Sequence, residues 1–219
     1  MTEDVVYGLW GSKEHEWSVR NSEGRSGGIL TVWRKEVIQP VFSFSSQGFL
    51  GIKSLVRGQV LYLINIYSPC ILVDKRNLWR DILEWKQKLE KGEWVIAGDF
   101  NSVKNKEERR GKENSKRGTE MVEFGEFLDK LELVDVQALG NMFTWIKPNG
   151  KAGSRLDRIL LSEELIHKWG VVAQVVGNRD ISDHKLVWLK ASRLDWGPKA
   201  FKVNRSWFEH KDFISFVKK

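Results

Sequence analysis

Short runs of apolar and aromatic residues recur along the chain, separated by clusters of Gly, Asn, Ser and Pro. Runs of this composition that are bounded by turn residues are typical of β-strands. They predict strands over residues 28–33, 51–56, 60–67, 94–97, 156–161, 171–176 and 185–189. The tripeptide Arg57-Gly58-Gln59 separates two of these strands and predicts a tight hairpin.

Three other segments have apolar residues every three to four positions, which is the spacing of one helix face. Residues 78–89 predict an amphipathic helix between two strands, and residues 121–131 predict a second one. We expect Thr119 to be the N-cap of the second helix. Ser162 is followed by two glutamates, and a hydroxyl cap with acids in the first turn predicts a short third helix.

Helices mixed with hairpin-connected strands indicate an α/β domain of layered sheets rather than a purely doubly wound one. The length of 219 residues and the apolar content of 41% are sufficient for one domain with a sizeable core. We assign that domain to residues 1–191. Residues 192–219 are basic and aromatic without a clear period, and we expect a linker or the start of a further region.

Composition excludes several classes of protein. No run of about 18 uncharged apolar residues is present, so no membrane-spanning helix is predicted. The acidic start lacks the basic region of a signal peptide. The single cysteine, Cys70, can form neither an internal disulfide nor a Cys-rich zinc site, so we expect an intracellular protein.

The chain has 36 Lys and Arg against 29 Asp and Glu, a net charge of +7 that points to a polyanionic partner. Two segments carry the excess. Residues 104–117 hold seven basic and three acidic side chains, and residues 190–219 hold eight and three. A solvated basic surface that binds nothing is the alternative for both segments.

Candidate catalytic side chains follow or begin the predicted strands. Asp99 and Asn101 are two residues apart after an apolar strand, so both could face one ligand, although an Asx-turn that ends the strand would give the same pattern. His184 precedes another strand, and a carboxylate that orients a histidine is a common way to activate water. Asp183 is its neighbour and points to the opposite side in an extended chain, so Asp157 is the better orienter. Taken singly, each of these side chains could equally be structural.

Five motifs occur in a fixed order: Asn65-Ile66-Tyr67-Ser68-Pro69, Ala97-Gly98-Asp99-Phe100-Asn101, Phe143-Thr144-Trp145, Arg155-Leu156-Asp157-Arg158 and Ser182-Asp183-His184. Together they resemble the endonuclease/exonuclease/phosphatase superfamily. The resemblance is closer to the apurinic/apyrimidinic-like endonuclease domain of plant non-LTR (LINE-type) retrotransposons, which the segments 26–30 and 195–198 also match. It covers nearly the whole chain.

The resemblance implies a two-sheet, four-layer α/β sandwich with the active site where the strand ends of the two sheets converge. By the family's scheme, His184 activates the attacking water and is oriented by Asp157, while Asp99 assists proton movement. Asn101 and Tyr67 contact the phosphate.

The same resemblance implies a divalent metal, Mg²⁺, held in part by Asp183, no small-molecule cofactor, and DNA as the partner. The residues that we expect to contact nucleic acid are Lys104, Arg109, Arg110, Trp145 and Arg155. A DNA substrate would require a nuclear location.

The chain also departs from the family. Members begin with a strand that ends in Asn, followed by a metal-binding Glu in a Gln-Glu-Thr-Lys-like motif, and neither occurs in this sequence. Residues 1–6 look like the helix that follows that Glu. We therefore expect the first strand-helix-strand unit to be missing and catalysis to be weakened, since a metal contributes several kcal/mol of charge stabilisation.

Three functions remain open at this point. The first is a Mg²⁺-dependent DNA endonuclease, and the second is a non-catalytic protein that retains nucleic-acid binding. The third is a phosphatase that acts on small phosphorylated substrates, because one fold can host several chemistries. The motifs at residues 143–145 and 155–158 favour the endonuclease branch.

Overall fold

The computed structural model describes residues 2–11, 14–22, 28–111 and 118–192. All seven predicted strands are present among them. The predicted terminal segment 192–219 lies outside the described residues except for Ser192.

A six-stranded sheet forms the centre of the molecule, with the strand order β3-β4-β5-β6-β12-β8. The strands are β3 (Gln39–Ser46), β4 (Phe49–Val56), β5 (Gln59–Tyr67), β6 (Glu93–Asp99), β12 (Asp157–Leu161) and β8 (Val134–Asp135). Only β5 and β6 pair in parallel within this sheet. Parallel neighbours need a crossover connection, and helix α2 (Leu72–Lys88) supplies it.

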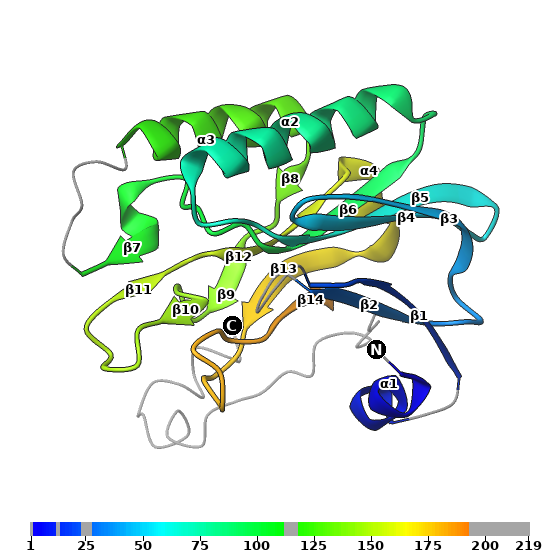
Figure 1. Cartoon of the computed structure of the whole chain (residues 1–219), viewed down its shortest axis with the longest axis horizontal. Helices are drawn as coiled ribbons and strands as arrows, with labels where there is room; N and C mark the ends of the chain where they lie inside the picture. The colour runs from blue at the N-terminus through cyan, green and yellow to red at the C-terminus, as the bar shows by residue number, and fades with distance from the viewer. Residues whose placement is uncertain (1, 12–13, 23–27, 112–117, 193–219) are drawn as a thin grey trace, which may run out of the picture.

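Helices α2 and α3 (Gly118–Leu131) lie side by side over one face of this sheet (Figure 1). Their apolar stripes form the main core with the sheet, where Leu78, Ile82, Phe124 and Leu131 are buried. Burial of these stripes against the sheet explains why residues 78–89 and 121–131 have apolar side chains every three to four positions. The predicted cap is wrong, because α3 already begins at Gly118 and Thr119 therefore lies inside its first turn.

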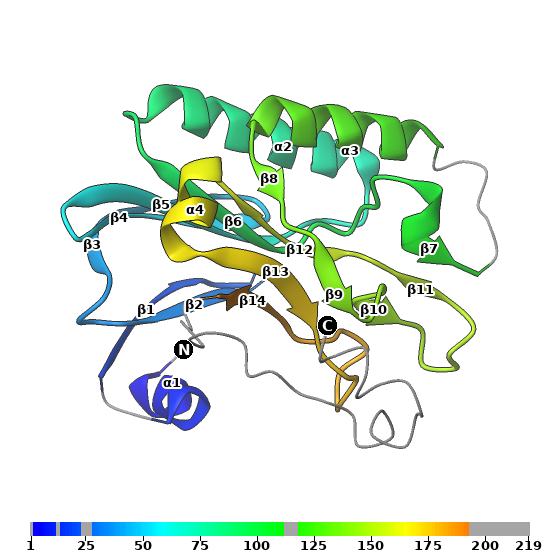
Figure 2. The same ribbon diagram turned by 180° about the vertical axis from the view of Figure 1, so that it is seen from behind.

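A second layer of strands covers the other face of the central sheet (Figures 1 and 2). It consists of the antiparallel pair β1 (His15–Arg20) and β2 (Ile29–Arg34) and of the sheet β14-β13-β9. The strands of that sheet are β14 (Val187–Ala191), β13 (Val171–Val176) and β9 (Ala138–Gly140). Helix α1 (Glu3–Trp10) lies beyond this layer. The predicted α/β sandwich with two layers of strands between helices is confirmed.

Helix α4 (Glu163–Trp169) begins where the sequence predicts, but its cap differs. Ser162 is the N-cap residue and makes no capping hydrogen bond to its own helix. Its hydroxyl instead accepts a hydrogen bond of 2.8 Å from the backbone N–H of Trp94, at the start of β6. Tertiary contact with a neighbouring strand has replaced the local cap.

The hairpin between β4 and β5 turns at Arg57 and Gly58, which have φ angles of 52° and 77°. Positive φ at both central residues is the requirement of a type I′ turn, and glycine satisfies it at the second position. This predicted hairpin is confirmed.

The sequence pattern did not predict several of the strands. Strand β3 is an edge strand whose side chains are mostly exposed, and β1 contains only half-buried and exposed side chains, so neither shows a clear apolar run. A small sheet of β10 (Trp145–Ile146), β11 (Gly153–Ser154) and β7 (Arg109–Arg110) consists of two-residue strands. Such short strands have too few residues to show alternation. A 3₁₀ turn, η1 (Lys106–Glu108), precedes β7.

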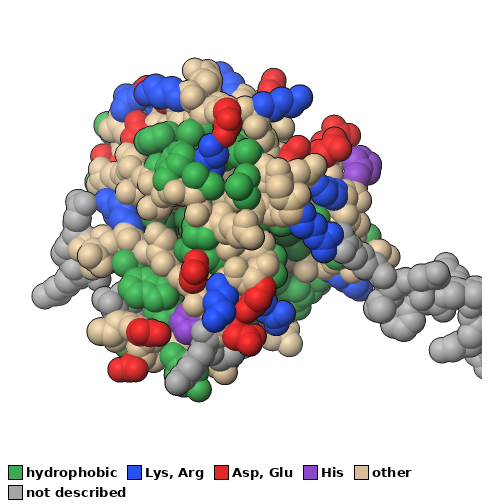
Figure 3. Space-filling model, turned by 90° about the vertical axis from the view of Figure 1, so that its right-hand side faces the viewer, with side chains coloured by type: hydrophobic (Ala, Val, Ile, Leu, Met, Phe, Trp, Pro, Cys, Tyr) green, Lys and Arg blue, Asp and Glu red, His purple; other side chains and the backbone are tan. Residues whose placement is uncertain are grey.

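The right-hand side of the molecule in Figure 1, seen face-on in Figure 3, has Lys and Arg interspersed with Asp and Glu. Hydrophobic side chains are visible between these charges. Among the helices of the described ranges, none is long and apolar enough to cross a membrane.

Candidate active site

Strand register brings three of the predicted site residues into one row. Asp99, the last residue of β6, lies opposite Tyr67 at the end of β5 and opposite Asp157 at the start of β12. Residues paired across neighbouring strands have their side chains about 5 Å apart on the same face of the sheet. Residues separated by up to 90 positions therefore meet at one end of the sheet because of this pairing.

His184 reaches the row from the loop before β14. Its Nδ1 lies 2.9 Å from Asp157 Oδ2. This hydrogen bond, assisted by the negative charges of Asp157, Asp99 and Asp183, raises the pKa of His184 above its ordinary value of 6.5, although partial burial opposes the shift. The imidazole is thus oriented by a carboxylate and made more basic by it.

Asp99 has a raised pKa. Burial, followed by repulsion from Asp157, raises the pKa of Asp99 from 3.8 to about 6. The backbone N–H of Asn101 and the positive charges of His184 and Lys75 oppose that rise. A carboxyl group with a pKa of about 6 can exchange a proton near neutral pH, as a general acid or base requires.

The turn after β6 presents Asn101 next to Asp99. Gly98 has a φ of 133°, and a Cβ on it would lie 2.1 Å from the carbonyl oxygen of Ile66, so only glycine fits there. Asp99 Oδ1 accepts a hydrogen bond of 2.8 Å from the backbone N–H of Asn101. This bond forms the Asx-turn that the sequence pattern offered as an alternative to a ligand-facing arrangement. Both side chains also line the same cleft, so the turn and the ligand-facing arrangement are present together.

Tyr67, Asp99, Asp157 and His184 together form the reactive row. The cleft has a volume of about 970 Å³ and is lined both by residues of this row and by basic residues. Tyr67, Asp99, Asn101 and His184 form part of its lining. Most of the rest of the lining, the basic wall, comes from the small sheet and its loop. Its residues with a positive charge or an aromatic ring are Arg109, Arg110, Trp145, Lys147 and Lys151. A smaller cavity of about 300 Å³ lies against the same row and is also lined by Tyr67, Asp99, Asp157 and His184.

Of the five residues predicted to contact nucleic acid, Arg109, Arg110 and Trp145 line the cleft, whereas Lys104 and Arg155 do not. The side chain of Lys104 lies 3.6 Å from Asp129 of α3. Sequence reasoning missed Lys147 and Lys151, which flank the turn Pro148-Asn149-Gly150 between β10 and β11. Two lysines around a Pro-Asn-Gly turn were a visible signal of a basic hairpin tip.

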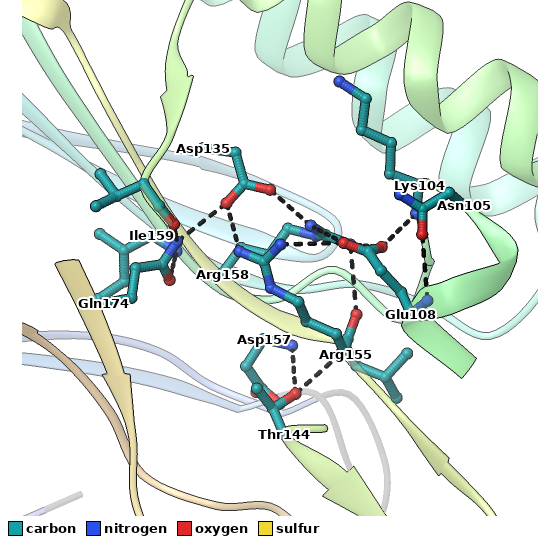
Figure 4. A network of polar contacts seen from close by, with 12 residues as sticks. Lys104, Asn105, Glu108, Asp135, Thr144, Arg155, Asp157, Arg158, Ile159 and Gln174 are labelled. Carbon is teal, nitrogen blue, oxygen red and sulfur yellow. Dashed lines mark hydrogen bonds and ion pairs between the residues drawn. The ribbon is translucent and has the colours of Figure 1, made fainter. Parts of the chain in front are cut away.

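Arg155 lies in a network of polar contacts (Figure 4) and does not line the cleft. Its guanidinium donates to Glu108 Oε1 at 3.0 Å and to Asp135 Oδ1 at 2.6 Å. Arg158, which is fully buried, donates to Asp135 Oδ2 at 2.6 Å and binds both carboxylate oxygens of Glu108. Burial alone would raise the pKa of Glu108, but Arg158 holds it below its ordinary value. The network is therefore a paired set of two cations and two anions.

This network connects the segment that carries Arg109 and Arg110 to the strand that carries Asp157. Glu108 belongs to η1, one residue before β7, and Arg158 follows Asp157 on β12. Thr144 adds a second link, because its buried hydroxyl accepts the backbone N–H groups of Leu156 and Asp157, both at 2.9 Å (Figure 4). The same set of buried polar contacts therefore holds both the basic wall and the reactive row in place.

Asp183 does not join the other carboxylates. Its Oδ2 accepts a hydrogen bond of 2.8 Å from Trp145 Nε1, and its side chain is exposed. Asp99 and Asp157 supply oxygen atoms, the donor type that Mg²⁺ prefers. Within the residues that the structure describes, however, no group of three or more His, Cys, Asp or Glu could hold a metal ion. These residues alone do not fit the predicted Mg²⁺ site.

The sequence model of the endonuclease/exonuclease/phosphatase family matches residues 4–184. The chain belongs to this family. Comparison with curated proteins gives no match.

Solved structures of the same architecture include the endonuclease domain of TRAS1, a telomere-specific non-LTR retrotransposon. It is 16% identical with a TM-score of 0.61 and matches 85% of this chain and 83% of that one. A family protein from Leptotrichia buccalis has 16% identity and a TM-score of 0.57 over 86% and 78% of the two chains. A humanized D. rerio TDP2 has 14% identity and a TM-score of 0.55 over 85% and 79%. These likenesses establish the fold.

Proposed function

We propose that this protein is a phosphodiester hydrolase that nicks DNA. One observation carries the proposal: Asp99 and His184, which is paired with Asp157, line the same cleft as the basic wall. A reactive row next to the basic wall suits a polyanionic substrate that is cleaved at one of its phosphodiester groups.

The side chains can perform the reaction in the following way. With Nδ1 committed to Asp157, the neutral imidazole of His184 has Nε2 to accept a proton from water. The resulting hydroxide attacks phosphorus, the bond to the leaving ester oxygen breaks, and Asp99 donates a proton to that oxygen. Asn101 and Tyr67 donate hydrogen bonds to the non-bridging oxygens, where negative charge increases.

The basic wall favours a polynucleotide over a small phosphorylated substrate. Arg109, Arg110, Lys147 and Lys151 can neutralise several successive phosphates, and Trp145 can stack on a base. A phosphomonoester would need only one such contact. Release of inorganic phosphate from an inositol phosphate would favour the phosphatase reading instead.

A non-catalytic nucleic-acid-binding protein is the second candidate. It is favoured by the incomplete set of metal ligands in the described ranges, because the basic wall could bind DNA without any reaction. Mg²⁺ as the cofactor, a plant retrotransposon origin and a nuclear location belong to the first proposal, that of a DNA-nicking hydrolase. Their support is the motif resemblance.

Nicking of supercoiled plasmid tests the proposal. The chain is incubated with Mg²⁺, with EDTA, and as the His184→Ala variant, and each protein is first shown to be folded by circular dichroism. We expect nicking by the wild type that is lost in the variant. Nicking that persists in His184→Ala would remove this site assignment, and DNA binding without nicking would support the second candidate.

A further inference from the structure

A buried lysine that does not line the cleft supports the loop after β6. Lys75 of α2 is only 1% exposed. Its ammonium donates to the carbonyl oxygen of Asn101 at 2.6 Å, to Ser102 Oγ at 3.0 Å and to Glu120 Oε1 at 2.6 Å. An ammonium has three N–H donors, so each has a partner. A lysine is almost never fully buried unless it is paired in this way.

The backbone that Lys75 holds is in an uncommon conformation. Asn101 has a φ of 50°, in the left-handed region that residues other than glycine rarely adopt. Its backbone N–H donates to Asp99, and its Nδ2 lies 3.2 Å from Cys70 Sγ and 3.4 Å from the carbonyl oxygen of Ser68. The carbonyl group of Asn101 is thus fixed by Lys75 while its side chain lines the cleft.

We propose that Lys75 is a positioning residue that sets the orientation of Asn101 toward the scissile phosphate. Lys75 does not line the cleft and contacts the loop through the Asn101 carbonyl and Ser102, while its positive charge also acts on the Asp99 carboxyl. The proposal rests on the proposed function for the role of Asn101, whereas the positioning itself can be measured without activity.

The next residue along α2 provides a matched control. Arg76 donates to Glu123 of α3 with two bonds of 2.7 and 2.6 Å, so it joins the same two helices as the Lys75–Glu120 pair. Its side chain is 49% exposed and pairs with Glu123. Arg76→Met therefore removes a bridge between α2 and α3 without removing a bond to the loop.

Two variants separate positioning from folding. Lys75→Met leaves the nearly buried Glu120 carboxylate with Ser102 Oγ as a donor but without its cation, and this uncompensated charge can unfold the protein by itself. The double variant Lys75→Met/Glu120→Gln removes that charge and keeps a similar volume. We expect the double variant to fold and its kcat for plasmid nicking to fall about 10- to 100-fold, the loss that misplaced catalytic groups cause. KM should change less than kcat, and Arg76→Met should nick like the wild type.

Hydrogen exchange followed by mass spectrometry gives the second readout. We expect the backbone amides of residues 100–102 to exchange about tenfold faster in the double variant than in the wild type, with no change in Arg76→Met. Unchanged exchange in this loop of the double variant would overturn the positioning role. If the wild type nicks, a kcat of the double variant equal to that of the wild type would overturn it as well. If the wild type does not nick at all but exchange in the loop accelerates, the positioning role stands and the proposed function fails.

Discussion

Asp99 of β6 and Asp157 of β12 are directly opposite each other in the antiparallel register of the central sheet. Their two carboxyl groups have different partners, because Asp157 Oδ2 bonds His184 Nδ1 whereas Asp99 Oδ1 accepts the backbone N–H of Asn101. In the proposed mechanism, Asp157 therefore supports the base His184 while Asp99 serves as the acid.

Replacing Asp99 by Asn should stabilise the fold at neutral pH. The folded-state pKa of about 6 lies above the ordinary value of 3.8, so the folded protein holds this proton more tightly than the unfolded chain does. This contribution to stability is complete below about pH 4 and is lost as the pH rises through about 6. We expect the free energy of unfolding of Asp99→Asn to exceed that of the wild type by an amount that grows to about 2–3 kcal/mol as the pH rises from 4 to 7.

Urea unfolding at several pH values measures this gain. Asp129→Asn, at an exposed carboxylate of α3, controls for the removal of one negative charge. A gap between Asp99→Asn and the wild type that stays constant from pH 4 to pH 7 would contradict the raised pKa of Asp99.

Loss of the carboxylate that orients His184 should slow nicking strongly. In Asp157→Asn the amide cannot accept the Nδ1–H bond with a negative charge, so the imidazole becomes less basic and its tautomer is no longer fixed. We expect a fall of about 10²- to 10⁴-fold in kcat. The pH at which the base must deprotonate should also move downward.

His167→Ala is the control for the His184 variants, because His167 is an exposed histidine of α4 that pairs only loosely with Glu163 at 3.9 Å. A pH–rate profile of Asp157→Asn that superimposes on the wild-type profile would show that Asp157 does not set the basicity of His184.

Breaking the buried network at Arg158 should destabilise the protein severely. Arg158→Met leaves Glu108 and Asp135 without their main partner in a buried place, which typically costs about 3–5 kcal/mol. The control is Arg80→Met, at an exposed arginine whose partners are Asp81 and Glu84 and whose loss should cost about 1 kcal/mol or less. Thermal unfolding of both variants tests the difference, and equal melting temperatures would contradict it.

The basic wall should make DNA binding sensitive to salt. We expect the logarithm of the affinity to fall linearly with the logarithm of salt concentration, because bound phosphates release counterions. Lys147→Ala and Lys151→Ala, on the hairpin between β10 and β11, should each reduce the slope by about 1.

Lys88→Ala is the control for these hairpin variants, since Lys88 lies on α2 and bonds Glu84 at the helix surface. Fluorescence anisotropy with a labelled duplex gives the slopes. A flat salt response would exclude binding through this wall, and a slope that changes as much in Lys88→Ala would show that net charge alone matters.

Sequence patterns located the long elements well, because their side chains repeat with the period of a strand or a helix over many residues. Strands β4, β5 and β6 and helix α2 are examples, since each buries one face in the main core. The caps at Thr119 and Ser162 could not be predicted reliably, because a serine hydroxyl can bond a neighbouring strand instead of its own helix. Two-residue strands such as β10 and β11 exist only through pairing partners that are distant in the sequence.

The sequence by itself determined the chemical groups of the site and their family resemblance, since Asp99, Asn101, Asp157 and His184 are recognisable from their motifs. Only the tertiary structure decided where the charged side chains point. Arg155 and Arg109 carry the same group, yet the first is enclosed between Glu108 and Asp135 and the second lines the cleft. Side-chain direction depends on the strand pairing and burial around each residue, and these are set by contacts between distant segments rather than by local sequence.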